Sequence, residues 1–113
     1  METLYSVPAD YAGAPGVVHG GIQAAILDEV LGFAVHDATG FDESVNVVTV
    51  DFRLRYRRPV PTGTELRIVG RHVRSDGHDH YVEGDILDAE GQVLTHAEAR
   101  WRRIDRPSPP SQD

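Results

Sequence analysis

The segment 16–29 predicts the start of a long helix, against which the remaining strand-like runs must pack. Gly20 and Gly21 stand where a loop turns into this helix, and the acidic pair Asp28 and Glu29 follows about two helical turns later. Glycine lets a ligand approach the backbone closely. The first amides of a helix have no partner within it and carry the positive end of its dipole. Such a helix start is suited to holding a developing negative charge on oxygen.

Apolar residues recur at helical spacing from about Gly20 to Asp37, and Gly40 ends the segment. They form one arc that should face a sheet: Ile22, Ile26, Leu27, Val30, Leu31, Phe33 and Ala34. Asp28 falls outside this arc and Glu29 lies at its edge, so the helical pattern alone makes both of them surface acids. Asp28 should lie roughly 10 Å along the helix from Gly21. The two can therefore act on one substrate atom only if the carboxylate comes from a second copy of the protein.

The rest of the chain consists of strand-like runs with short connections. Residues 46–56 alternate, with Val48, Val50, Phe52, Leu54 and Tyr56 on one face and Thr49, Asp51, Arg53, Arg55 and Arg57 on the other. Further strands are expected at 4–7, 65–74, 80–87 and 92–104, with turns at 75–77 and 88–91. One helix against an antiparallel meander is an α+β domain.

Composition limits the classes of partner. The net charge of −7 and the pI of about 5.2 argue against binding to nucleic acid or to an anionic membrane. The absence of cysteine excludes disulfides, thiolate catalysis and cysteine-ligated metals. No apolar segment approaches the ~20 residues of a membrane span, and we expect no signal peptide in the first residues. We expect a soluble cytoplasmic protein with one domain at 1–105 and a disordered proline-rich tail at 106–113.

The segment 75–80 contains two histidines and two aspartates and has the composition of a metal site. His78 and His80 alternate on a strand, however, so they should point to opposite faces and chelate a metal poorly. A polar hairpin turn is the expected structure, and we expect neither a metal nor another cofactor.

Several features together resemble one known family. They are Val18-His19-Gly20-Gly21, seven further residues ending in Asp28, a long helix, and four strand-like runs. This pattern is similar to the hotdog-fold acyl-CoA thioesterases of the phenylacetyl-CoA type, and the likeness spans residues 3–104. The segment 56–63 also matches the end of the family's long strand. The resemblance implies a hotdog fold, an acyl-CoA or acyl-carrier substrate, and a homodimer that is often doubled to a homotetramer.

The resemblance also implies roles for individual residues. Asp28 matches the family's catalytic carboxylate, which attacks the thioester itself or deprotonates a water, and the sequence leaves both routes open. Glu29 is the alternative acid at the substrate, because some related hotdog thioesterases use Glu. His19 would orient the loop or the substrate carbonyl, and the N–H of Gly20 or Gly21 would form the oxyanion hole. Thr49 matches a position where relatives often carry Ser or Thr near the water.

One position departs from the family, because many members have Asn where this chain has Gly13. This departure keeps open a protein that binds acyl-CoA without hydrolysing it, although such a binder would not need Asp28. A hydratase would need a catalytic histidine, for which only His36 lies near the helix end, and no motif supports it. The arginines Arg53, Arg55, Arg57 and Arg58 are either a solvated strand face or a grip on the phosphates of coenzyme A.

Overall fold

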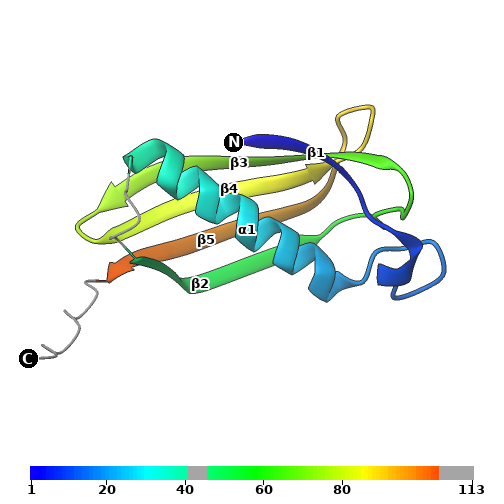
Figure 1. Ribbon diagram of the computed structural model, residues 1–113, viewed down its shortest axis with the longest axis horizontal. Helices are drawn as coiled ribbons and strands as arrows, with labels where there is room; N and C mark the ends of the chain where they lie inside the picture. The colour runs from blue at the N-terminus through cyan, green and yellow to red at the C-terminus, as the bar shows by residue number, and fades with distance from the viewer. Residues whose placement is uncertain (41–45, 105–113) are drawn as a thin grey trace, which may run out of the picture.

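The computed structural model describes residues 1–40 and 46–104. The elements, in chain order, are β1 (Glu2–Ser6), a 3-10 turn (Ala9–Tyr11), α1 (Gly20–Thr39), β2 (Asn46–Tyr56), β3 (Glu65–Asp76), β4 (Asp79–Leu87) and β5 (Val93–Ile104). The strands form one antiparallel sheet in the order β1-β3-β4-β5-β2, and α1 lies across one face of it (Figure 1). The predicted α+β architecture is therefore confirmed. The expected tail at 106–113 lies outside the described residues.

The helix begins and ends at the residues that the sequence indicates. Its N-cap is His19, and its C-cap is Gly40, which has the left-handed φ of 63° that favours glycine. The last turn extends two residues beyond the predicted Asp37, and the Thr39 hydroxyl bonds back to the carbonyl oxygen of Val35 (2.6 Å). No helix in the described part of the chain is long and apolar enough to cross a membrane.

The core lies between α1 and the central strands, and it corrects one expectation about the helix. Leu27, Leu31 and Val35 of α1 are fully buried against the sheet. Phe33, predicted to belong to the apolar arc, is instead 51% exposed. Helical spacing alone does not fix the edges of a buried face. In the structure the buried face of α1 includes Val35 and excludes Phe33.

Two sheet glycines let the helix approach the sheet closely. A Cβ atom on Gly84 would lie 2.7 Å from the carbonyl oxygen of Val69 and 2.9 Å from a methyl carbon of Leu31. A Cβ atom on Gly70 would lie 3.0 Å from a methyl carbon of Val30. These positions fix the depth at which α1 lies on β3 and β4, and so the distance of its polar residues from the strands.

The strict alternation predicted for β2 is wrong, because the strand contains a bulge. Thr49 pairs with Trp101 and Asp51 pairs with Arg100, so Val50 is the extra residue. The bulge moves Thr49 to the side of the sheet that faces α1, the side on which Phe52 and Leu54 also lie. Val48 and Val50, predicted to share the apolar face, are each 39% exposed.

The two hairpin connections of the meander differ in how well they were predicted. The β3–β4 turn was expected at 75–77, but Asp76 pairs with Asp79 and the turn consists of Gly77 and His78. The expected turn at 88–91 is confirmed: the Asp88 carboxylate accepts hydrogen bonds from the N–H groups of Glu90 (3.0 Å) and Gln92 (2.8 Å). Both turns are short, so the meander keeps the strands in register beneath the helix.

Candidate active site

The loop before α1 is tied to its neighbours by backbone hydrogen bonds. The N–H of Val18 donates to the carbonyl of Val60 (2.8 Å), and the N–H of His19 donates to the carbonyl of Tyr11 (2.9 Å). Gly13 lies beside His19, and a Cβ atom there would be 3.4 Å from the Cα atom of His19, an ordinary contact. Gly13, the position that departs from the resemblance, is therefore adjacent to His19 in this fold.

His19 caps the helix with its side chain. Its Nδ1 accepts a hydrogen bond from the N–H of Gly21 (2.9 Å), which satisfies one of the free donors at the helix start. The N–H of Gly20 has no hydrogen-bond partner within residues 1–40 and 46–104. Of the two glycine amides that the sequence proposed for an oxyanion, only that of Gly20 is open.

The buried side-chain amide of Gln23, for which the sequence predicts no role, anchors this turn to the sheet. Gln23 is 4% exposed, its Nε2 donates to the carbonyl of Val18 (3.1 Å), and its Oε1 accepts from the hydroxyl of Thr95 (2.6 Å). Buried polar groups are costly unless they are paired, and both ends of this amide are. The available signal was a polar residue four positions before Leu27, on the apolar side of the helix.

Asp28 faces the edge of the sheet formed by β2. The hydroxyl of Thr49 donates a hydrogen bond to Asp28 Oδ1 at 2.9 Å, and Asp28 is half-buried. The bulge at Val50 makes this contact possible, because it turns Thr49 toward the helix. The structure thus brings together two of the residues that the sequence singled out.

Glu29 lies on another side of the helix. It lines a hollow of about 310 Å³ between α1 and β1, together with Met1, Tyr5 and Phe33. It is therefore not brought together with Asp28 and Thr49.

The arginines are divided between two hollows. Arg57 and Arg58 line an open hollow of about 590 Å³ that also includes Gly20, Gly21 and Tyr56. Arg55 lines a second hollow with Arg53, Arg57, His96 and Glu98. Arg57 lines both hollows. Arg58 lines the hollow at the helix start, and Arg55 does not.

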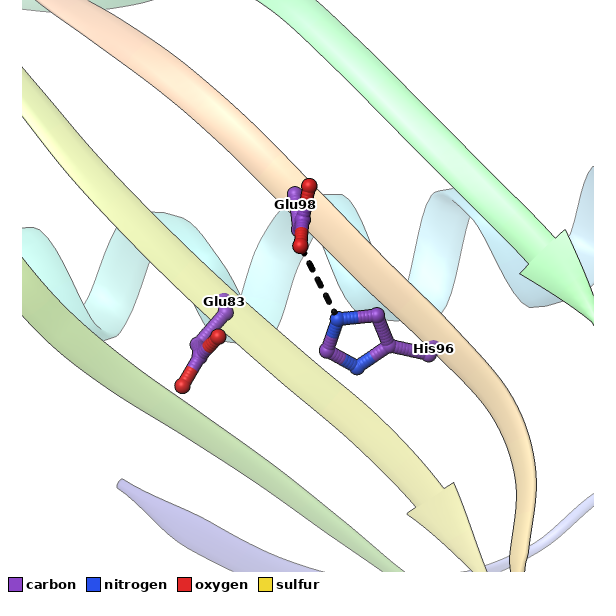
Figure 2. A group of neighbouring side chains, drawn as sticks. All are labelled: Glu83, His96 and Glu98. Atoms are coloured by element: carbon purple, nitrogen blue, oxygen red, sulfur yellow. Dashed lines mark ion pairs between the residues drawn. The ribbon is translucent and has the colours of Figure 1, made fainter.

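A second group of polar side chains lies on the face of the sheet opposite α1. Figure 2 shows Glu83, His96 and Glu98 on this outer face, with potential ligand atoms within 4.8 Å of one another. Asp85 is 7% exposed and bonds to His96 Nδ1 (2.7 Å), and Arg71 bonds to both Asp85 (2.9 Å) and Glu83 (3.2 Å). Burial alone would raise the pKa of Asp85, but the hydrogen bonds from His96 and Arg71 outweigh it and lower the pKa. The carboxylates are therefore largely balanced by their neighbours.

The histidines of segment 75–80 separate in the structure. His78 lies in the turn, whereas His80 is 5% exposed, with its Nδ1 3.2 Å from His72 Nε2 and 3.0 Å from the hydroxyl of Ser75. Burial, with the charge of His72 as a second cause, lowers the pKa of His80. This cluster lies near the β3–β4 turn, and no residue of the Asp28–Thr49 pair takes part in it.

Comparisons with known proteins identify the family and the fold of this chain. The model of the thioesterase superfamily matches residues 15–95. A solved thioesterase superfamily protein is 35% identical, with a TM-score of 0.77 over 89% of this chain, which spans 47% of that protein. A phenylacetic acid degradation-related protein from Ralstonia eutropha JMP134 is 27% identical, with a TM-score of 0.79, and 89% of this chain and 74% of that one are covered.

A protein from Bacillus halodurans, solved with CoA, shares the fold at 24% identity with a TM-score of 0.79, and the match covers 91% of this chain and 66% of that one. The match to the superfamily model includes the whole segment from the glycine turn to β4 and the start of β5. The chain therefore belongs to the thioesterase superfamily, and its fold is the hotdog fold.

Proposed function

We propose that this protein hydrolyses an acyl-CoA or acyl-carrier thioester to the free acid and the thiol. The observation that carries the proposal is the 2.9 Å hydrogen bond from Thr49 to Asp28, at the side of α1 that faces β2. This contact supports the proposal, because it orients a carboxylate that the thioesterase resemblance matches to the catalytic acid. The open N–H of Gly20 supplies the second part that a thioester hydrolase needs, a donor for the carbonyl oxygen.

The proposed site is shared between two copies of the chain. β2 is the last strand of the sheet, and it presents Val48, Val50 and Tyr56 as exposed apolar residues. Such an edge is a ready template for pairing with a second copy. In the proposed antiparallel β2–β2 pairing about a two-fold axis near the middle of the strand, the Thr49 end of one β2 lies beside the opposite end of the other.

This pairing solves the distance problem posed by the sequence. Within one chain, Asp28 lies roughly 10 Å along the helix from Gly21. The hydroxyl of Tyr56 bonds to Gly20, so the end of β2 marks the position of the glycine turn. The two-fold axis brings Asp28 and Thr49 of one protomer toward the glycine turn of the other, and a dimer then contains two equivalent sites.

In the proposed reaction, the thioester carbonyl oxygen accepts a hydrogen bond from the N–H of Gly20, at the positive end of the helix dipole. In the other protomer, the hydroxyl of Thr49 donates a hydrogen bond to Oδ1 of Asp28 in the same chain. That carboxylate takes a proton from water as the water oxygen bonds to the carbonyl carbon. The C–S bond then breaks, and the leaving thiolate takes up the proton from the Asp28 carboxyl group, which restores the carboxylate.

The carrier end of the substrate is assigned to the hollow at the helix start. Arg57 and Arg58 line it beside Gly20 and Gly21. Guanidinium groups bind phosphate through their forked donors. The Bacillus halodurans protein of the same fold was solved with CoA. Coenzyme A, which carries several phosphates, is therefore our proposed carrier.

A second candidate function is acyl-CoA binding without hydrolysis. Gly13 favours it, because the family's Asn would lie beside His19 and this chain has no side chain there. The experiment that separates the two incubates the purified protein with aromatic and aliphatic acyl-CoAs and follows the release of thiol. Enzyme-dependent release supports hydrolysis. Saturable binding by calorimetry with no release from any member of the panel would contradict it and support the binder.

A further inference from the structure

We propose that Tyr56 is a positioning residue of this site, which holds the peptide group between Gly20 and Gly21 so that the N–H of Gly20 stays directed at the substrate. This inference rests on the proposed function. Tyr56 is the last residue of β2, and its hydroxyl donates a hydrogen bond to the carbonyl oxygen of Gly20 (2.9 Å). It is 51% exposed and lines the same hollow as Gly20, Gly21, Arg57 and Arg58.

The same peptide group is held from its other end. The carbonyl of Gly20 and the N–H of Gly21 belong to one planar unit. Tyr56 binds the carbonyl, and His19 Nδ1 binds the N–H at 2.9 Å. A peptide flanked by two glycines has more rotational freedom than any other. Two side chains from different elements remove this freedom and leave the preceding N–H, that of Gly20, as the open donor.

The ring of Tyr56 lies close to Gly20, and the ring of His19 lies close to Gly21. A Cβ atom on Gly20 would lie 3.3 Å from the hydroxyl oxygen of Tyr56 and 3.4 Å from its ring. A Cβ atom on Gly21 would lie 3.1 Å from the ring of His19. Both contacts are tighter than ordinary side-chain packing. The glycine pair therefore gives the two rings room to reach the backbone.

Two paired residues of the sheet, Tyr56 and Thr95, hold the start of the helix. Tyr56 and Thr95 are paired residues of β2 and β5. Thr95 reaches the carbonyl of Val18 through Gln23, and this connection is buried. Tyr56 reaches Gly20 at the surface. The buried connection should contribute mainly to stability, whereas the exposed hydrogen bond, which is worth little to folding, acts on the orientation of the Gly20 amide.

The test is Tyr56→Phe, which keeps the ring and removes the hydroxyl. Loss of one hydrogen bond that acts on the transition state should lower kcat by about three- to tenfold. KM should stay within about twofold, because ground-state binding is not changed. Exchange of the Gly21 amide with solvent, followed by NMR without substrate, should become faster. Tyr5→Phe is the matched control, since Tyr5 is 44% exposed and lines the hollow between α1 and β1.

Three results would overturn the inference: unchanged kcat and amide exchange, a raised KM at constant kcat, or a lowered Tm with normal kcat. The second result would make Tyr56 a simple substrate contact, and the third a simple structural residue. If the wild-type protein hydrolyses no thioester, the proposed function fails. The exchange rate of the Gly21 amide still tests the restraint on the peptide in that case.

Discussion

The two faces of the sheet use polar residues in opposite ways. On the outer face, Asp85 bonds to His96 at 2.7 Å and to Arg71 at 2.9 Å, so its carboxylate is already balanced by its neighbours. On the face toward α1, one acid, Asp28, accepts a hydrogen bond from Thr49 at the edge of the sheet. The outer face has the higher charge density, and the helix-facing side has the proposed chemistry. The proposal therefore assigns the chemistry to the side with fewer ionisable residues.

Among the variants that test this contrast, Asp28→Asn should have the largest effect on kcat. Asparagine keeps the size of the side chain and can still accept a hydrogen bond from Thr49, but it cannot take a proton from water. General base catalysis contributes ~10²–10⁴-fold, so kcat should fall by that order. Tm should barely change, because Asp28 lies outside the buried stripe of α1.

Glu29→Gln is the matched control, because Glu29 is the next residue and lines the hollow toward β1. Its turnover should stay near the wild-type value. Normal turnover of Asp28→Asn with loss in Glu29→Gln would show that the wrong acid was assigned. Normal turnover of both variants would place the site elsewhere.

On the outer face, Asp85→Asn should lower the stability and leave kcat unchanged. Hydrogen bonds to charged groups contribute about 1.5–3 kcal/mol, so the free energy of unfolding should fall by about that amount while kcat stays unchanged. Asp85 has a lowered pKa in the folded state, so its contribution is complete above its unfolded pKa of about 3.8 and is lost as the pH falls through the folded value. Denaturant unfolding at pH 7 and at pH 3 measures both effects.

Glu98→Gln serves as the control on the same face, since Glu98 is 57% exposed and its contact with His96 is 3.5 Å long. It should change the stability by less than about 0.5 kcal/mol. A loss of turnover in Asp85→Asn without a loss of stability would remove the distinction between the two faces.

A smaller effect should separate the arginines of the two hollows. Arg58→Ala should raise KM for an acyl-CoA severalfold with kcat little changed, because it removes uniform binding of the carrier. The effect should shrink with added salt, which screens exposed charges over roughly 8–10 Å. Arg55→Ala, in the hollow with His96 and Glu98, should leave KM near the wild-type value. Equal changes in both variants at low salt would mean that the phosphates are not held at the helix start.

Most of the fold could be predicted from the sequence because its periodicities are local. The helix end at Gly40 and the turn at 88–91 follow from residue types at fixed spacing. The bulge at Val50 could not be predicted, because alternation assumes that each residue of a strand opposes one residue of its neighbour. That single extra residue decides which face Thr49 occupies.

The candidate site shows the same division between local and distant information. His19, Gly20, Gly21 and Asp28 stand in one contiguous motif, so the resemblance could identify them. The structural roles of Gln23 and Tyr56 depend on partners 72 and 36 residues away, and no local pattern encodes such contacts. The sequence does show a polar residue at an apolar helix position and a tyrosine at a strand end. Neither feature indicates which residue it contacts.

The most direct test of the shared site is complementation between two inactive variants. Asp28→Asn lacks the carboxylate, and Gly20→Val places a side chain against the ring of Tyr56, at the proposed oxyanion donor. Melting curves confirm that each variant is folded, and co-expression with two different tags yields mixed dimers. Random pairing makes half of the dimers mixed, each with one intact site of two, so the preparation should recover about a quarter of the wild-type activity. Purified mixed dimers that stay as inactive as either parent would contradict the shared site.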